Sequence, residues 1–481
     1  MKVGAERRGF APRPATRRSQ EPGLMPTSVS TAWLFWITLC FGCFLALFTP
    51  AMFRAEALRE IDLNGLDLPA LGLYCMTILS ALVGIRWCVF LIMSYAAMSR
   101  NEAEPLPSRD EVLPFVSILV PAHCEAACIH DALSALVRLD YPNYEVIVVD
   151  DGSDDDTWRL ALPFAGMHHS EFGTSQVQVF TKPNQGKWSA HNFALRHASA
   201  DLILCIDADS RIESDALRHM VRRMRDPRVG AVSGQVRVRN RKALLNLFQA
   251  FEYVLANGGQ RLAQGATGSV MIVPGPIGLF RRNILLEVQQ ENERLNGPED
   301  RKLPGPFSSL TFAEDFQLSL TVLALGHRVE YAPWAIAHTK APSTTAALIS
   351  QRYRWNRGAV QVLLWYFKRR ARGIRSPLKL NIWLWSAVLL DYLCFPLLFF
   401  VLLAGLLMFF LNGGSLSTVL AWTAAAWMLR MMAGTLYAIA HRDDVRLSVL
   451  APLFDFYQGT LLNCAWVMSM FDQARGAAMR W

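Results

Sequence analysis

Long stretches of the sequence contain almost no charged residues. Charged side chains make up 18% of the 481 residues and hydrophobic ones 52%. The charges gather in one polar block, between residues 113 and 375, with apolar segments before and after it. This distribution excludes a soluble protein built around one ordinary core, and it is typical of an integral membrane enzyme of two or three structural units.

The sequence also lacks cysteine clusters with the spacing of a metal site. Its nine cysteines are scattered. Cys40 and Cys43 have C-x-x-C spacing but lie inside an apolar run, without a second pair. Cys124 and Cys128 have no His or Cys partner at metal-binding spacing. We therefore expect free thiols.

An excess of acidic residues is absent too, since the formal net charge is +8. Much of the positive excess lies in residues 1–30 and in residues 368–379, and both flank apolar segments. Attraction to anionic lipid headgroups explains this placement better than nucleic acid binding does. We expect membrane lipids, and no nucleic acid, as partners.

Apolar runs at both ends of the chain predict transmembrane helices. Residues 1–30 form a disordered basic tail in this interpretation, and residues 31–98 hold two spans, Thr31–Phe53 and Ala70–Met98. The loop between them, 54–69, carries two arginines against four acidic residues. The basic tail therefore stays in the cytoplasm, and so does the polar block.

Residues 380–471 predict about three further spans, followed by a C-terminal tail at 472–481, and residues 351–379 predict interfacial helices. The expected spans are Asn381–Leu411, Val419–Ala440 and Leu447–Phe471. Arg86, Asp391 and Arg430 fall inside predicted spans, where an ionisable group needs a polar path or a partner. Both alternatives, a translocation path and an intramembrane ion pair, stay open.

Strand and helix patterns alternate at the start of the polar block. Unbroken apolar runs predict strands at 116–120, 144–149, 177–181 and 202–206. Helical spacing at 129–139 and 189–197 separates them. This order argues for a parallel sheet covered on both faces, with a ligand site beyond the carboxyl ends of its strands.

Acidic residues follow two of these strands. Asp207 and Asp209 come after the strand 202–206, where two carboxylates can share one hard divalent cation and so neutralise a diphosphate. Asp150 and Asp151 follow the strand 144–149, with a glycine next that lets a nucleotide approach the backbone. Lys187 ends a Pro-Asn-Gln-Gly-Lys turn and could reach a phosphate. Ordinary turn chemistry is the alternative for each motif.

Two further motifs lie later in the block. Glu314 and Asp315 precede an apolar helix, where they either stabilise the helix dipole or supply a general base, Asp315, for an acceptor hydroxyl. Gln351, Arg354 and Trp355 share one helix face. An amide, a cation and an aromatic ring there suit a sugar beside a diphosphate, although an amphipathic surface helix is the alternative.

These four motifs, in this order on an α/β block between membrane spans, resemble the processive family 2 glycosyltransferases, which include cellulose, hyaluronan, chitin and poly-N-acetylglucosamine synthases. The resemblance covers roughly residues 113–365. It implies an α/β fold of the GT-A-like type, with a Rossmann-like mixed sheet, in a cytoplasmic glycosyltransferase domain at 113–350 inserted between transmembrane helices. It also implies a UDP-sugar-dependent hexosyltransferase in the cell membrane.

The resemblance further implies roles for single residues. Asp150, Asp151, Lys187 and Asp207 would bind the donor, and Asp209 with Asp207 would hold Mg2+ or Mn2+. Asp315, beside Glu314, would be the catalytic base. The acceptor and diphosphate would meet Gln351, Arg354, Trp355, Gly275 and Pro276. Two departures stand out: Cys124 replaces the Asn usual before Glu125, and Ala313 replaces a Thr before Glu314.

The implied reaction is inverting, processive polymerisation of a β-linked polysaccharide, which leaves through a channel formed by the spans. The loop 274–278 favours UDP-N-acetylglucosamine as donor, with UDP-glucose and a cellulose-like product as the alternative. A non-processive transferase acting on a lipid acceptor and an idle scaffolding subunit are the competing hypotheses. The sequence leaves an accessory membrane subunit, a cyclic dinucleotide switch and the role of residues 287–309 open.

Overall fold

The structure is a computed structural model that describes residues 32–45, 68–103, 106–107, 111–295, 305–309, 311–371, 377–386, 391 and 416–477. The predicted N-terminal tail lies outside the described residues, and so do most of the predicted span 381–411 and parts of the spans and loop before residue 68.

A nine-stranded mixed sheet forms the centre of the polar block, in the order β3-β4-β2-β1-β5-β8-β7-β9-β6. The strands are β1 Val116–Ala122, β2 Asn143–Asp150, β3 Gly166–Ser170, β4 Gly173–Thr181, β5 Leu202–Cys205, β6 Arg211–Ile212, β7 Val229–Val238, β8 Gly278–Arg281 and β9 Arg328–Thr339. Strands β4, β2, β1 and β5 are parallel neighbours, as predicted. Antiparallel strands β3, β8 and β6 make the whole sheet mixed.

Helices cover both faces of this sheet because its strands are apolar on both sides. Alternate residues of β2 separate into two cores: Ile147 and Val149 in one, Val146 and Val148 in the other. The first core contains side chains of α5 (Lys187–His197), α9 (Arg282–Leu295), α10 (Glu314–Ala324) and α11 (Thr345–Ala371). The second contains side chains of α3 (Ile129–Leu136) and α6 (Ala216–Arg223). The predicted two-sided burial is confirmed for the parallel strands.

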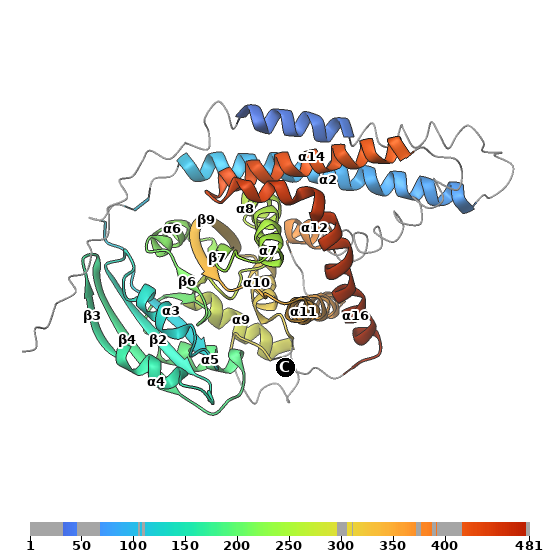
Figure 1. Cartoon of the computed structure of the whole chain (residues 1–481). Coiled ribbons are helices and arrows are strands. Elements are labelled where there is room, and N and C mark those ends of the chain that lie inside the picture. The colour runs from blue at the N-terminus through green and yellow to red at the C-terminus, as the bar shows by residue number, and fades with distance from the viewer. Residues whose placement is uncertain are drawn as a thin grey trace, which may run out of the picture.

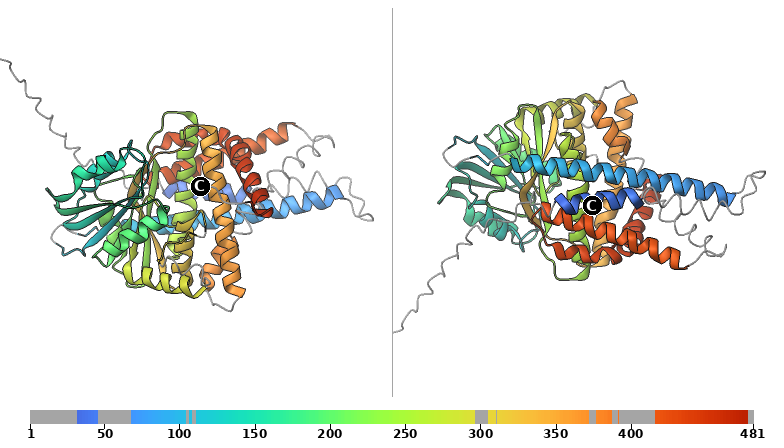
Figure 2. Two further views of the ribbon diagram at one scale, coloured as in Figure 1. Left: turned by 90° about the horizontal axis from the view of Figure 1, so that it is seen from below. Right: turned by 90° about the horizontal axis from the view of Figure 1, so that it is seen from above.

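A separate group of helices packs beside the sheet domain (Figures 1 and 2). Helix α2 (Leu68–Ala103) and helix α14 (Leu416–Ala440) run alongside the helix Ala32–Leu45 and share a third apolar core with α7 (Leu244–Leu255). The remaining described segments here are η2 Ala256–Arg261, α8 Leu262–Ala266, α12 Leu378–Ser386, η5 Val445–Leu450, α15 Ala451–Tyr457, η6 Gln458–Leu462 and α16 Asn463–Ala474.

One helix of the described chain is long and apolar enough to cross a bilayer: Val419–Ala440, of 22 residues and mean hydropathy 1.2. It coincides with one predicted span. The predicted second span, Ala70–Met98, lies within the 36-residue helix α2. The predicted span Leu447–Phe471 is not one α-helix: it divides into η5, α15, the π-helical turn η6 and α16.

The three ionisable residues of the predicted spans each have a partner. Arg86 donates two hydrogen bonds to Asp391, at 2.7 and 2.8 Å, and Gln260 of η2 donates a third at 3.0 Å. Arg430 forms an ion pair with Asp455. These contacts favour the ion-pair alternative over a translocation path for all three residues.

Candidate active site

The predicted site residues gather at the carboxyl edge of β2, β1 and β5. Because these strands are parallel neighbours, the loops that follow them meet at one edge of the sheet. Strand β8 runs antiparallel to β5, so the loop that precedes β8 arrives at the same edge. Helix α10 begins there with the acidic pair Glu314 and Asp315. Five separate chain segments therefore meet at this edge: the loops after β2, β1 and β5, the loop before β8, and the start of α10.

Lys187, the first residue of α5, contacts two of these segments. Its Nζ lies 2.6 Å from Oδ1 of Asp207 and 3.7 Å from Oε1 of Glu314. Burial alone lowers the pKa of Lys187, but Asp207 and Glu314 outweigh this effect, and the pKa ends above its ordinary value. Lys187 is thus a fixed cation between carboxylates of two motifs that are over 100 residues apart in the sequence.

Gly275 lies directly against the pair Lys187–Asp207. A Cβ at this position would lie 2.7 Å from Nζ of Lys187 and 3.1 Å from both carboxylate oxygens of Asp207. The loop is held in place by the turn in which Ile277 N–H donates to the carbonyl of Pro274 at 3.1 Å. The predicted acceptor loop, with Gly275 and Pro276, therefore adjoins the predicted donor residues.

Asp150 and Asp151 are almost fully buried and are engaged within the protein. Asp150 accepts hydrogen bonds from Ser153 and Thr181. Asp151 accepts from the ammonium of Lys182 and, at 2.7 Å, from the backbone N–H of Gly186. Asp151 thereby anchors the loop that ends in Lys187, so in this structure its contacts shape the donor side of the site from within the protein.

Three carboxylates concentrate negative charge near the end of β5. Burial, followed by repulsion from Asp207, raises the pKa of Asp209. Burial together with Asp209 and Asp207 raises the pKa of Glu125, in the loop after β1, to about 7. In the sequence, Glu125 follows Cys124, which departs from the family pattern, and no role was predicted for it. Only the fold brings the loop after β1 close to the carboxylates that follow β5.

This acidic group fits a hard divalent cation. Carboxylate oxygens are the ligands that Mg2+ and Mn2+ favour, and such ions are commonly bound by one or two carboxylates plus substrate phosphates. No three His, Cys, Asp or Glu side chains of the described chain converge on a single metal position. Asp207 and Asp209 are the two predicted residues of this acidic group that could hold such an ion.

Glu314 and Asp315 occupy the first turn of α10. Burial raises the pKa of Asp315, and repulsion from Asp207 adds to the effect, while Lys187 opposes it. Burial also raises the pKa of Glu314. A carboxylate of raised pKa is a stronger proton acceptor, which is the property that a general base needs. Asp315 also accepts a hydrogen bond from the N–H of Phe316 at 2.7 Å, a contact that the helix-dipole alternative predicts as well.

Helix α11 presents the Q-x-x-R-W motif. Arg354 is exposed and Trp355 is 43% exposed, although the guanidinium of Arg352 lies 4.2 Å above the Trp355 ring. Oε1 of Gln351 is buried and has no hydrogen-bond partner among the described residues. An aromatic ring and a cation that face outwards, beside an unsatisfied amide oxygen, leave this face able to contact a polar ligand.

Gly358, one turn beyond Arg354, allows this helix to pack closely against the segment that precedes Glu314 and Asp315. A Cβ on Gly358 would lie 2.8 Å from the backbone nitrogen of Ala313 and 2.9 Å from its Cβ. Thr311 donates a hydrogen bond to the carbonyl of Gly358 at 3.1 Å. The segment before Glu314 therefore packs directly on α11. The sequence gave no role to Gly358, and a lone helical glycine was the only available signal.

Arg261, in η2, is a second residue that sequence patterns missed. It is a buried cation that lowers the pKa of Asp315 by electrostatic attraction, in opposition to the larger effect of burial. Its Nη1 has no hydrogen-bond partner in the described chain. The electrostatic effect of Arg261 on Asp315 requires that η2 and α10 lie close together, and no local sequence pattern predicts this.

A mixed sheet of this order, with its acidic carboxyl edge and the adjoining Q-x-x-R-W helix, defines a glycosyltransferase domain of the GT-A-like type. Residues 114–358 match the family described as "Glycosyltransferase like family 2", and the match covers just over half of the chain. The chain belongs to this family and is a glycosyltransferase.

Among curated proteins, the chain is 28% identical over 285 residues to the poly-beta-1,6-N-acetyl-D-glucosamine synthase of Staphylococcus epidermidis strain RP62A, a match of 59% of this chain and 64% of that protein. It is 29% identical over 322 residues to the enzyme of the same name from Staphylococcus aureus strain COL, a match of 65% of this chain and 72% of that protein. The chain thus spans less than two thirds of the S. epidermidis protein.

Among solved structures, the chain is similar to the mannosyltransferase PcManGT from Pyrobaculum calidifontis in complex with GDP-Man and Mn2+. The TM-score is 0.49 at 23% identity, over 79% of this chain and 99% of that one.

Proposed function

We propose that this chain is an inverting, processive polymerase that builds a β-linked polysaccharide from a UDP-sugar. The observation that carries the proposal is the meeting of Lys187, Asp207, Gly275 and the pair Glu314–Asp315 at one sheet edge, against the helix that bears Q-x-x-R-W. The donor sugar, the base and the acceptor hydroxyl must lie about 3 Å apart to react, and these segments supply groups suited to each role.

In the proposed reaction, Asp315 takes the proton from a hydroxyl of the acceptor. The hydroxyl oxygen attacks the anomeric carbon of the donor sugar as the bond to the diphosphate oxygen breaks. UDP leaves with the bonding electron pair, and the proton remains on Asp315. A single displacement inverts the anomeric configuration, so an α-linked donor gives a β-linkage.

Positive charge at the diphosphate would stabilise the leaving group. Lys187 supplies one fixed cation, and Arg354 supplies an exposed guanidinium on α11. Asp207 and Asp209 would hold Mg2+ or Mn2+, which supplies further neutralisation when bound. In this scheme Trp355 stacks on a sugar ring of the acceptor, and Gln351 donates or accepts a hydrogen bond beside it.

The proposed donor is UDP-N-acetylglucosamine, because the two curated relatives are named for a polymer of N-acetyl-D-glucosamine. The loop Pro274-Gly275-Pro276-Ile277-Gly278 favours the same choice, and UDP-glucose is the second candidate. We further propose a multi-pass protein of the cell membrane with its catalytic domain in the cytoplasm. The growing chain would leave through its own spans, of which α14 is the helix best suited by length and hydropathy.

The decisive experiment measures turnover by the purified chain in lipid nanodiscs with a panel of UDP-sugars and either Mg2+ or Mn2+. Linkage-specific hydrolases then identify the product. The expected result is a high-mass glycan from UDP-N-acetylglucosamine. A product that extracts into organic solvent, without high-mass glycan, would instead establish a lipid acceptor.

Asp315→Asn tests the base in the same assay. General-base catalysis contributes about 10²–10⁴-fold, so the variant should lose at least about a hundredfold in kcat. Asp201→Asn, an exposed carboxylate before β5, is the matched control and should keep full turnover. Unchanged polymer output by Asp315→Asn would contradict the proposal and favour an idle subunit.

A further inference from the structure

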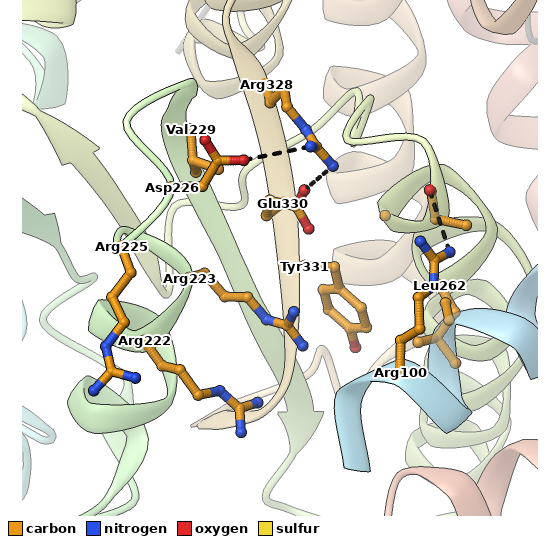
Figure 3. A pocket seen from close by; sticks show the side chains of 13 residues that line it. Arg100, Arg222, Arg223, Arg225, Asp226, Val229, Leu262, Arg328, Glu330 and Tyr331 are labelled. Carbon is orange, nitrogen blue, oxygen red and sulfur yellow. Dashed lines mark hydrogen bonds and ion pairs between the residues drawn. The ribbon is translucent and has the colours of Figure 1, made fainter. Parts of the chain in front are cut away.

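The arginines beside the cavity of about 350 Å³ in Figure 3 have structural partners. Arg328 of β9 pairs with Asp226 at 3.4 Å and with Glu330 at 2.6 Å. Arg100 of α2 donates a hydrogen bond to the carbonyl of Ala266 at 3.3 Å. These cations are satisfied within the protein, so the cavity alone indicates no ligand.

Arg352, on α11, has a partner of a different kind. It is the second residue of Gln351-Arg352-Tyr353-Arg354-Trp355, a position that the Q-x-x-R-W motif leaves open. Its guanidinium carbon lies 4.2 Å from the centroid of the Trp355 ring. Residues three apart are neighbours on a helix surface, so the helix itself brings these two side chains together. A cation over the face of a tryptophan ring is attracted by the electrons of the ring.

A carboxylate on a second helix fixes this guanidinium. Arg352 donates a hydrogen bond to Oε2 of Glu252, on α7, at 2.9 Å. Tyr457, on α15, donates its hydroxyl to the same oxygen, also at 2.9 Å. Arg352 is 6% exposed and Tyr457 is 2% exposed, so water competes little for these hydrogen bonds. Three helices from separate parts of the chain therefore hold the cation that lies over Trp355.

The tyrosine at the end of this series is itself fixed by packing. The ring of Tyr457 stacks on Phe248 of α7, with centroids 5.2 Å apart, and contacts Phe454. Tyr457 and Phe454 belong to the third apolar core. A buried ion pair is often no more stabilising than apolar residues of similar volume. Stability alone therefore does not explain why Arg352 and Glu252 stand in this apolar surrounding.

The contact with Arg352 leaves only part of the Trp355 ring available. The side chain is 43% exposed, although the guanidinium lies over one face of the ring. A sugar ring can therefore stack only on the other face. Without the guanidinium, the indole would be free to turn about its two side-chain bonds among several rotamers. The cation thus determines which face of Trp355 is open and in which orientation.

We propose that Arg352 is a positioning residue, which holds the Trp355 ring with one face open for the acceptor sugar, and that Glu252 and Tyr457 hold Arg352. The inference rests on the proposed function, in which Trp355 stacks on the acceptor. It assigns the acceptor to the ring face opposite Arg352. Loss of the contact lowers the population of the productive ring orientation and so weakens the hold on the acceptor. The donor residues on the sheet edge are left in place.

Turnover by the purified full chain in lipid nanodiscs tests the proposal, with the UDP-sugar that supports polymerisation. Arg352→Gln should shorten the mean product about two- to thirtyfold, because a cation–π contact favours the held ring by about that factor. The KM for the UDP-sugar should stay unchanged, which a general loss of structure would not allow. Tyr457→Phe should shorten the product less. This variant keeps the ring packing and carries the test if Arg352→Gln does not fold.

Tyr353→Phe is the matched control for Tyr457→Phe. Tyr353 also lies on α11, and its hydroxyl donates to a carboxylate, that of Asp472 on α16, at 2.8 Å. The control therefore removes the same kind of hydrogen bond between helices without removing a partner of Arg352. It should keep the product length of the wild type.

Oxidative labelling of Trp355, read by peptide mass spectrometry, reports on the ring without turnover. Labelling should rise in Arg352→Gln and Tyr457→Phe and stay at the wild-type level in Tyr353→Phe. Unchanged labelling in the first two variants would overturn the proposal.

Trp355→Ala separates a failure of this inference from a failure of the proposed function. If Trp355→Ala keeps the wild-type product length, acceptor stacking is lost from the proposed function, and the positioning role is lost with it. If Trp355→Ala shortens the product while Arg352→Gln and Tyr457→Phe both match Tyr353→Phe, only the positioning role is overturned.

Discussion

Gly275 illustrates how much of the site depends on single atoms. The space that its missing side chain leaves is filled by the ammonium of Lys187 and the carboxylate of Asp207, whose own contact is 2.6 Å. With a larger residue at this position, the loop that is proposed to hold the acceptor would have to displace the ammonium of Lys187. Steric access, rather than backbone conformation, explains the residue here.

Gly275→Ala should displace Lys187 or the loop by several tenths of an ångström. Misplacement of reacting groups by about 1 Å costs about a hundredfold, so we expect kcat to fall between about tenfold and a hundredfold with little change in Tm. Turnover and Tm of the purified chain measure both. Gly259→Ala is the matched control, because its Cβ would meet its nearest neighbour, Tyr437, at an ordinary 3.8 Å. Full activity of Gly275→Ala would show that the loop does not need this close approach.

Glu125 gives the site a measurable dependence of stability on pH. Its pKa rises from 4.5 to about 7 in the fold, so the folded state holds this proton more tightly than the unfolded chain does. The resulting stability is complete below about pH 4.5 and is lost as the pH rises through about 7. Glutamine mimics the protonated acid, which is the favoured form in the absence of metal.

Glu125→Gln should therefore match the wild type near pH 4.5 and exceed its Tm above pH 7, in EDTA. We expect a gain of at least about 2 °C, the shift that 1 kcal/mol gives in a domain of this size. Thermal unfolding across the pH range measures it. Glu171→Gln, on an exposed residue beyond β3, should show no such gain. A pH-independent gain for Glu125→Gln would assign the effect to packing instead of charge.

Residue types at strand ends were predictable from the sequence, whereas their partners were not. Asp207 and Lys187 were singled out from local patterns and Gly275 from the family resemblance, and the structure brings all three into contact. Asp150 and Asp151 were expected to face a nucleotide. Their contacts to Ser153, Thr181, Lys182 and Gly186 come from loops whose course no pattern specifies.

At the scale of elements, helix α11 and the start of α10 act as one unit. Gly358 allows the helix axis to approach Ala313 so closely that an added methyl group would lie under 3 Å from its backbone. Thr311 fixes the same contact by its hydrogen bond to the carbonyl of Gly358. The distance between Q-x-x-R-W and the acidic pair thus depends on a residue that belongs to neither motif.

Gly358→Ala tests this contact against an opposing effect. Alanine favours a helix over glycine by about 1 kcal/mol, so propensity alone would stabilise the variant. We expect net destabilisation instead, because overpacking costs about 1–3 kcal/mol, together with a fall in kcat as Trp355 and Arg354 shift away from Asp315. Denaturant unfolding and turnover measure the two effects. A variant that is more stable and fully active would show that α11 does not depend on this contact.

Elements with a strong local period were predictable, and short or interrupted ones were not. Strands β1, β2 and β5 follow the predicted ranges to within two residues because their apolar runs are continuous, and helix α5 does so too, whereas β4 begins four residues before the predicted range 177–181. Strands β6 and β8, of two and four residues, are too short to leave a pattern. The predicted span Leu447–Phe471 is interrupted by Pro452 in the first turn of α15 and by the π-helical turn η6, which hydropathy does not register.

For the whole molecule, the central question is how the helices outside the sheet domain are held to it. The contact of Arg86 and Asp391 joins α2 to the segment after α12, and Gln260 connects both to η2. The side chains of Arg86 and Asp391 are 13% and 25% exposed, so water screens their attraction only partly. This pair therefore couples three regions that are far apart in the sequence.

Exchanging the charges of Arg86 and Asp391 distinguishes a structural role for this pair from a role in guiding the polysaccharide. Loss of one partner from a buried pair costs about 3–5 kcal/mol, so Arg86→Ala and Asp391→Ala should each lower the Tm and the yield of folded protein in membranes. The double exchange, Arg86→Asp with Asp391→Arg, should restore much of both, because the bidentate pair can form in either direction and Gln260 can present its carbonyl oxygen instead of its amide. If these side chains guided the polysaccharide instead, single variants would keep the Tm and shorten the product, and the exchange would not restore its length. Measurement of Tm and polymer length on the same four proteins decides between the two, and the observed geometry predicts recovery by the exchange.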